Sequence, residues 1–196
     1  DLERGVVTDA PNLAWRNVPL RNAVARRFKC PVTLANDVDA GLYGEYVAGA
    51  AQGARCAVGI FPGTGIGGAC VYAGQLVRGR THSCMEIGHL PVIPGGQRCG
   101  CGAFGCLETV ASRLAIAGAA AQAVARGEAP HLEKLAGTDL ANLRSGTLAA
   151  AIKAGDEAIE QIVRQAARWT GIAAGYCVNL LAPDVIVIGG GLAEAM

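Results

Sequence analysis

Aromatic residues, charged residues and long apolar runs are all scarce in this sequence. Of its 196 residues, 5% are aromatic and 17% charged, with a formal net charge of +1 and no basic run. This composition disfavours a nucleic-acid or membrane surface, so the predicted partners of this region are small molecules. The sequence has no stretch of about 18 apolar residues, and its start, DLERG, has no features of a signal peptide, so we expect a cytoplasmic protein without a membrane segment.

Glycine, apolar residues and cysteine are well represented instead. The 28 glycines and 52% apolar residues allow a substantial core in one or two domains. Five cysteines stand singly in apolar surroundings and are predicted to be buried thiols, not disulfides: Cys30, Cys56, Cys70, Cys84 and Cys177. The other three, Cys99, Cys101 and Cys106, lie in a glycine-rich loop that we predict is too short and polar to bury them.

Strands and helices alternate along the chain, which is typical of an α/β fold. The pattern predicts strands at 30–35, 55–61, 69–73 and within 184–192, helices at 39–51, 109–126 and 157–181, and a polar connection or short helices over 127–146. Glycine loops follow two of these strands, at 62–68 and 189–191. Asn36 and Asp37 follow the first strand.

The most specific pattern is Cys99-x-Cys101-x4-Cys106 with His89 upstream. Three thiolates and one imidazole are the ligands of a closed, tetrahedral structural zinc site, and the glycines between the cysteines allow tight turns. The C-x-C spacing is tighter than that of a zinc finger. The alternative is three loop thiols beside an unrelated histidine. His82 and His131 have no comparable neighbours and are expected at the surface.

The first glycine loop, PGTGIGG at 62–68, is neither a dinucleotide fingerprint nor a P-loop, because both need a following helix and the P-loop also needs a lysine. A Gly-Thr-Gly turn between strands can present backbone N–H groups and the Thr64 hydroxyl to an anion. The second loop, Gly189 to Gly191, follows a buried strand, where α/β folds open their ligand crevice. Alternatively, the first loop is an ordinary hairpin turn.

Several polar residues allow two interpretations. Asn36 and Asp37 either cap the next helix or place Asp37 as a general base, with Asn36 fixing the reacting hydroxyl. Glu86 and Glu108 bracket the cysteine cluster, and a zinc-stiffened loop would hold both with the His89 ring around a polyhydroxylated ligand. The alternative is that both glutamates are solvated surface charges, or that Glu108 starts the following helix, where the helix dipole favours a carboxylate.

These segments together resemble the ROK family of bacterial sugar kinases and sugar-responsive repressors. The matching segments are APNLAW (10–15), LANDVDAGLYGE (34–45), GTGIGG (63–68), EIGHLPV (86–92), CGCGAFGCLE (99–108) and NLLAPDVIVIGGGL (179–192). They cover nearly the whole chain in the family's order.

The resemblance implies an α/β fold of the actin-like ATPase (ribonuclease H-like) type with two lobes, the first incomplete. Residues 1–50 would end the N-terminal lobe, and residues 51–196 would form the C-terminal lobe with a zinc loop at 89–106. The implied activity is transfer of the γ-phosphate of ATP to a hexose hydroxyl by a glucokinase-like protein. The implied assembly is a dimer or tetramer. The alternative within the family is a sugar-sensing transcriptional repressor.

The resemblance also assigns roles to individual residues. Asp37 would be the catalytic base and would bind the sugar with Asn36, Glu86, His89 and Glu108. Gly63, Thr64, Gly65 and Gly67 would hold the phosphates of ATP with Mg²⁺, and Gly189, Gly190 and Gly191 would lie near the adenosine. Structural Zn²⁺ would be bound by His89, Cys99, Cys101 and Cys106.

The sequence departs from the family pattern in three places. Ser83, Cys84 and Met85 stand where small residues are usual, Asp39 replaces a frequent Asn, and the D-x-G-x-[ST] phosphate loop is absent. We therefore expect an internal fragment that is inactive alone. Intact Asp37 and GTGIGG favour the kinase over the repressor, and a zinc-stabilised module without a ligand leaves both features unexplained.

Overall fold

A computed structural model describes residues 1–10, 13–80 and 83–195. His82, which we expected at the surface, lies outside these residues, as do two positions of the segment 10–15.

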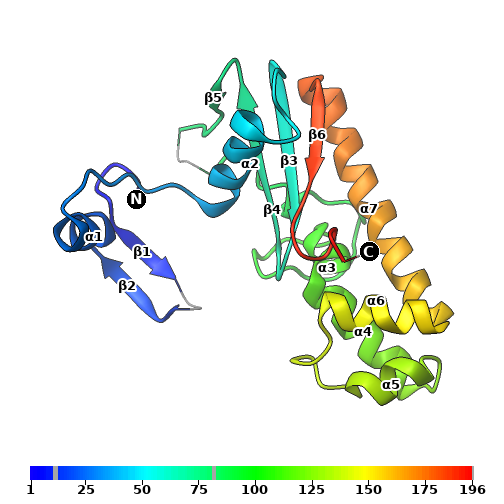
Figure 1. The fold of residues 1–196 in the computed structure, drawn as a ribbon. Coiled ribbons are helices and arrows are strands. Elements are labelled where there is room, and N and C mark those ends of the chain that lie inside the picture. The colour runs from blue at the N-terminus through cyan, green and yellow to red at the C-terminus, as the bar shows by residue number, and fades with distance from the viewer. Residues whose placement is uncertain (11–12, 81–82, 196) are drawn as a thin grey trace.

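The N-terminal residues form a small unit that lies apart from the main sheet (Figure 1). Strand β1 (Val7–Ala10) pairs antiparallel with β2 (Trp15–Val18), and helix α1 (Leu20–Phe28) follows. The Arg21 guanidinium donates hydrogen bonds of 3.1 Å to the carbonyl oxygens of Glu3 and Arg4. Since α1 buries none of its residues, this unit is held mainly by hydrogen bonds and contributes little to the core.

The strand predicted at 30–35 is wrong. Residues 31–36 have no regular secondary structure and lead directly into helix α2 (Asp37–Ala48). A β-strand needs a hydrogen-bonded neighbour, and no strand of the described residues pairs with this segment. Asn36 and Asp37 therefore lie at the start of a helix and not at the end of a strand.

The main sheet has the strand order β5-β4-β3-β6. Strands β3 (Cys56–Pro62), β4 (Ile66–Tyr72) and β5 (Gln75–Leu76) are antiparallel neighbours, and β6 (Val185–Ile188) returns parallel to β3. Side chains of β3 alternate between the two faces, so Val58 and Ile60 enter one core and Ala57 the other.

Helices cover both faces of this sheet (Figure 1). Helix α2 packs on one face, where Leu42 is fully buried with Ala57 and Val71. The other face carries α3 (Glu108–Ala111), α4 (Arg113–Ala125) and α7 (Glu157–Leu181). Helices α5 (Pro130–Ala136) and α6 (Ser145–Ala154) extend this second layer beyond the end of the sheet. None of the helices in the described residues is long and apolar enough to cross a membrane.

Two of the predicted helices differ from the structure. Helix α7 covers 157–181 as predicted, whereas the helix predicted at 109–126 is two helices divided at Ser112. Ser112 has an extended backbone, and its hydroxyl accepts the Ala115 N–H at 3.1 Å, so a side-chain cap starts a new helix. The helix predicted at 39–51 instead begins at Asp37 and ends at Ala48.

The single cysteines are mostly buried, as predicted. Cys56, Cys70 and Cys177 lie in the core between the sheet and α7, where burial raises the pKa of Cys70 to about 12. Cys84 is half-buried. The prediction is wrong for Cys30, which is exposed because it follows α1 in the unit without a core.

The start of β6 is joined to β3 by one carboxylate. Asp184 accepts the backbone N–H groups of Arg55 and Cys56, both at 2.8 Å, and these bonds lower its pKa from an ordinary value of 3.8. A lowered pKa in the folded state stabilises the fold above the unfolded-state pKa, and this contribution is lost as the pH falls through the folded-state value. We expect Asp184→Ala to lower the unfolding free energy at pH 7 and to differ less from the unsubstituted chain below pH 3.8. Urea unfolding at several pH values measures this; a difference that grows on acidification would contradict it.

Candidate functional site

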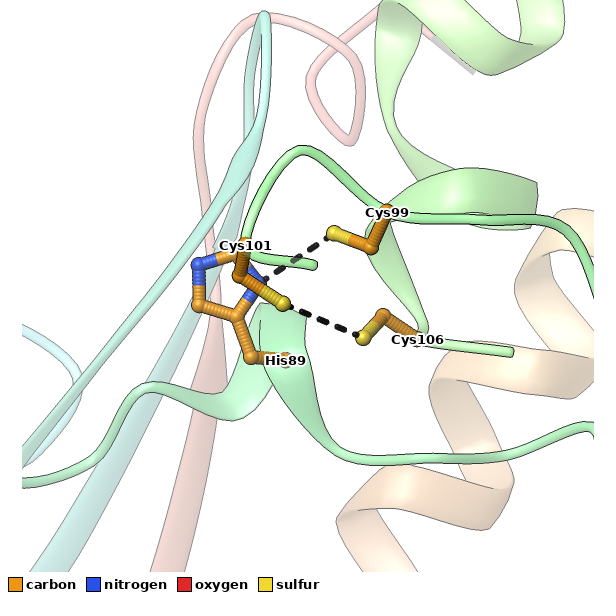
Figure 2. A group of neighbouring side chains, drawn as sticks. All are labelled: His89, Cys99, Cys101 and Cys106. Atoms are coloured by element: carbon orange, nitrogen blue, oxygen red, sulfur yellow. Dashed lines mark hydrogen bonds between the residues drawn. The ribbon is translucent and has the colours of Figure 1, made fainter. Parts of the chain in front are cut away.

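Four potential metal ligands converge in the loop between β5 and α3 (Figure 2). The ligand atoms of His89, Cys99, Cys101 and Cys106 all lie within 4.8 Å of one another. His89 Nδ1 is 3.6 Å from Cys99 Sγ, and Cys101 Sγ is 3.8 Å from Cys106 Sγ. The other ring nitrogen of His89 points away from the three sulfurs. The four residues predicted from spacing are therefore brought together.

Backbone hydrogen bonds shape this loop. The Cys99 N–H donates to the Ala103 carbonyl at 2.8 Å, and the Gly105 N–H donates to Gln97 at 2.8 Å. Gly105 has φ of 75°, and a Cβ there would collide with the Ile93 carbonyl, so the position requires glycine. The loop buries more than predicted, because Cys99 and Cys106 are buried and only Cys101 is exposed.

The thiols of this cluster differ in acidity. Burial raises the pKa of Cys106 to about 12, whereas a backbone hydrogen bond from Ala103 lowers the pKa of the exposed Cys101. The buried Cys106 thiol therefore loses its proton less readily than the exposed Cys101 thiol. A metal ion would supply the positive charge that a buried thiolate needs.

Two distances within the cluster match those between the ligand atoms of a zinc site. Zn–S bonds of about 2.3 Å and Zn–N bonds of about 2.05 Å give tetrahedral edges of about 3.8 Å between sulfurs and about 3.6 Å between sulfur and nitrogen. The two pairs at 3.8 Å and 3.6 Å match these edges. The Cys/His cluster is thus compatible with a closed structural zinc site.

Beside this loop, two separate segments pack against the start of β4, namely α2 and the stretch from Met85 to Gly88. A Cβ at Gly67 would collide with Val38 of α2, and one at Gly68 would collide with the Met85 carbonyl and Ile87. A Cβ at Gly88, in the 3-10 helix η2 (Ile87–His89), would collide with the Ile66 carbonyl. Ile66 to Gly68 therefore belong to β4 and not to the glycine loop predicted at 62–68, and the glycines serve close packing.

Asn36 and Asp37 lie at the N-terminus of α2. The Asn36 side chain accepts the N–H groups of Val38 at 2.9 Å and Asp39 at 3.2 Å, which makes it the N-cap. Asp37 is exposed, and its carboxylate accepts the adjacent Val38 N–H. The capping interpretation thus holds for Asn36, and it leaves the Asp37 carboxylate accessible from solvent.

The two glutamates occupy different surroundings. Glu86 is exposed at the start of η2. Glu108 begins α3, two residues after Cys106, and accepts the Ile66 N–H at 3.1 Å. A Cβ at Gly65 would collide with this Glu108 carboxylate. Glu108 therefore joins the cysteine loop to the glycine turn.

Both glycine loops reach one pocket of about 800 Å³, a size typical of small-molecule sites. Its lining residues are Pro62, Gly63, Thr64, Arg113, Leu114, Leu140, Ala141, Arg144, Ser145, Gly146, Gly191 and Leu192. The Gly63 N–H donates to the Gly65 carbonyl at 2.8 Å and closes the turn. Gly189 and Gly190 pack beside Phe61 and Pro62, while Gly191 faces the pocket.

Two arginines of this pocket were missed from the sequence. Arg113 donates its backbone N–H to the Gly63 carbonyl at 2.9 Å and its guanidinium to the Thr64 hydroxyl at 3.0 Å. Arg144 directly precedes α6. The signal that could have revealed them is an arginine at the start of a helix, because the helix dipole disfavours a positive charge there.

The chain matches the model of the ROK family over residues 1–196. A glucokinase of Halalkalibacterium halodurans is 36% identical over 199 residues, which cover 100% of this chain and 59% of that protein. The crystal structure of a ROK family glucokinase from Streptomyces griseus, in complex with glucose and AMPPNP, is 36% identical with a TM-score of 0.85, and the match covers 98% of this chain and 62% of that one. The crystal structure of a ROK family transcriptional regulator, a homologue of the E. coli MLC protein, is 32% identical with a TM-score of 0.82. This match covers 98% of this chain and 48% of that one.

The chain therefore belongs to the ROK family, and its fold is the α/β fold of the actin-like ATPases, as predicted. It spans about 60% of the length of the two glucokinases that it resembles. The predicted lobe boundary at residue 50 stays a prediction.

The close packing at β4 generates a test. We expect Gly67→Ala to lower the unfolding free energy by about 1–3 kcal/mol, because the new methyl group displaces Val38 and with it α2. Gly44→Ala is the matched control, since a Cβ at this exposed position of α2 meets nothing within 4 Å and should stabilise the helix by about 0.5–1 kcal/mol. Urea unfolding of both variants measures the effect, and equal stability would show that α2 does not depend on this contact.

Proposed function

We propose that the protein to which this chain belongs is an ATP-dependent sugar kinase that transfers the γ-phosphate to a hexose hydroxyl. One observation carries the proposal. The segments bearing Asp37, Glu86 and Glu108 all pack against the start of β4, directly after the turn that lines the 800 Å³ pocket. A polar acceptor site and an anion site thus adjoin each other, as phosphoryl transfer requires.

On the acceptor side, Asp37 is the general base. Its carboxylate is accessible and lies at a capped helix start, so it can take the proton of a sugar hydroxyl without moving the helix. Asn36 orients that hydroxyl, and Glu86, His89 and Glu108 bind the other hydroxyls. His89 can contribute because one of its nitrogens faces the cysteines and the other points away from them.

On the donor side, the turn at Gly63 to Gly65 binds phosphate oxygens through its backbone and the Thr64 hydroxyl. Gly67 keeps the start of β4, directly after this turn, against α2, and Gly189 to Gly191 border the nucleoside part of ATP. Mg²⁺ bound to the phosphates would offset the charge that develops during transfer.

We also propose that His89, Cys99, Cys101 and Cys106 bind a structural Zn²⁺. The ion takes no part in the transfer. It fixes the loop that leads into α3, whose first residue Glu108 accepts the Ile66 N–H, and so it positions this carboxylate relative to the glycine turn.

A sugar-sensing repressor is the second candidate, because the likeness to the regulator structure, with a TM-score of 0.82, is nearly as strong as that to the glucokinase. A repressor needs sugar binding but neither a base nor a phosphate turn. Asp37 and the 63–65 turn are both present, which favours the kinase.

Asp37→Asn tests the proposed base. In the complete protein, we expect the substitution to retain sugar binding and to lower turnover by about 10²- to 10⁴-fold, because an amide cannot accept the hydroxyl proton. ATP-dependent ADP release over a panel of hexoses and N-acetylhexosamines measures turnover, and calorimetry measures sugar binding.

The same assay separates the two candidates. Asp39→Asn is the matched control, because it also removes one carboxylate from the first turn of α2. The Asp39 carboxylate pairs with Arg78 at 3.5 Å and has no proposed part in the transfer. Unchanged turnover in Asp37→Asn would exclude Asp37 as the base. Sugar binding by the unsubstituted protein without any ADP release would support the repressor. The 196-residue chain alone should release little or no ADP.

Cys101→Ser tests the zinc proposal. Loss of a residue that only supports a metal ligand weakens metal binding by roughly 10- to 100-fold. Because Cys101 is itself a proposed ligand, we expect a larger loss of zinc affinity and a lower thermal midpoint of unfolding. Cys30→Ser is the control, since Cys30 is also an exposed cysteine but lies outside the cluster. Metal analysis and thermal unfolding measure both variants, and zinc retained equally in the two would refute the site.

A further inference from the structure

Arg113 and Arg144 line the pocket of about 800 Å³ and form no ion pair with a carboxylate of the described residues. Among residues 1–10, 13–80 and 83–195, no Asp or Glu lines the pocket. Elsewhere the chain does pair such side chains, as in Arg126 with Glu128 and Arg164 with Glu160. The pocket therefore holds two unneutralised positive charges.

Both arginines also stand where the backbone disfavours them. Arg113 is the first residue of α4 and Arg144 immediately precedes α6, and neither helix has an acidic residue in its first turn. A cation at a helix N-terminus is repelled by the helix dipole. Two such cations facing one cavity are stabilised when an anion lies between them.

The contacts of each arginine leave donors free for a ligand. Arg113 uses one guanidinium nitrogen on the Thr64 hydroxyl, and Arg144 uses Nε on the Ala141 carbonyl at 3.2 Å. A guanidinium has five N–H donors. Because the Thr64 oxygen accepts from Arg113, its own O–H is free to donate to a phosphate oxygen.

Resting on the proposed function, we propose that Arg113 and Arg144 form a clamp for the phosphate chain of the phosphoryl donor, with Arg113 also orienting Thr64. The clamp recognises a linear polyphosphate anion. Among the described residues that line the pocket, the side-chain hydroxyls are those of Thr64 and Ser145, and both can donate to phosphate oxygens.

Calorimetry with inorganic tripolyphosphate and with adenosine, using the 196-residue chain, tests the clamp. We expect Arg113→Gln and Arg144→Gln each to weaken tripolyphosphate binding by about 10- to 100-fold, the range for a charge-assisted hydrogen bond, and to leave adenosine binding unchanged. Arg113→Lys keeps the charge but not the planar fork and should recover part of the affinity. Arg164→Gln is the control, because it removes one arginine from an ion pair on α7 away from the pocket.

Tripolyphosphate binding that is equal in Arg113→Gln, Arg144→Gln and Arg164→Gln would overturn the clamp, as would no binding by the unsubstituted chain. Thermal unfolding shows whether each variant is folded. If Arg113→Gln does not fold, the tripolyphosphate affinities of Arg144→Gln and Arg113→Lys test the clamp instead. The kinase proposal is judged separately by ADP release from the complete protein. If the complete protein releases ADP but tripolyphosphate binding does not depend on the two arginines, only the clamp proposal is refuted. If tripolyphosphate binding depends on the arginines but the complete protein releases no ADP with any sugar, only the kinase proposal is refuted.

Discussion

The fold around the candidate site depends on the lack of side chains at the start of β4. Gly67 and Gly68 allow α2 and the segment before η2 to pack directly on the strand, and Gly88 brings η2 against the Ile66 carbonyl. Each added methyl group would separate one of these segments from the strand. The relative positions of Asp37, Glu86 and His89 are therefore set by close backbone packing and not by hydrogen bonds between these side chains.

The break between α3 and α4 joins this packing to the pocket. Because Ser112 caps a new helix, the Arg113 N–H is free to donate to Gly63. At the other end of the four-residue α3, Glu108 accepts the Ile66 N–H and follows closely after Cys106. One short helix thus connects the cysteine cluster with both ends of the glycine turn.

Spacing in the sequence predicted the parts of the site that depend on local chemistry. The Cys/His cluster was predicted because its four ligands lie within about 20 residues, and α7 was predicted from an uninterrupted apolar period. The strand at 30–35 was wrong because strand formation depends on a distant partner that no local pattern reveals. The glycines at 67 and 68 looked like a loop because a close approach by another segment leaves the same sequence signal as a turn. Arg113 and Arg144 were missed because only the tertiary fold brings them to one pocket.

Helix α2 follows a segment without regular structure, residues 31–36, yet packs on the main sheet through the buried Leu42. The N-terminal unit, by contrast, lies apart from that sheet (Figure 1). A hinge motion of the N-terminal unit about residues 31–36 would therefore leave the distance between Asp37 and the glycine turn unchanged. The packing of α2 on the sheet, and not the N-terminal unit, sets where Asp37 lies relative to the start of β4.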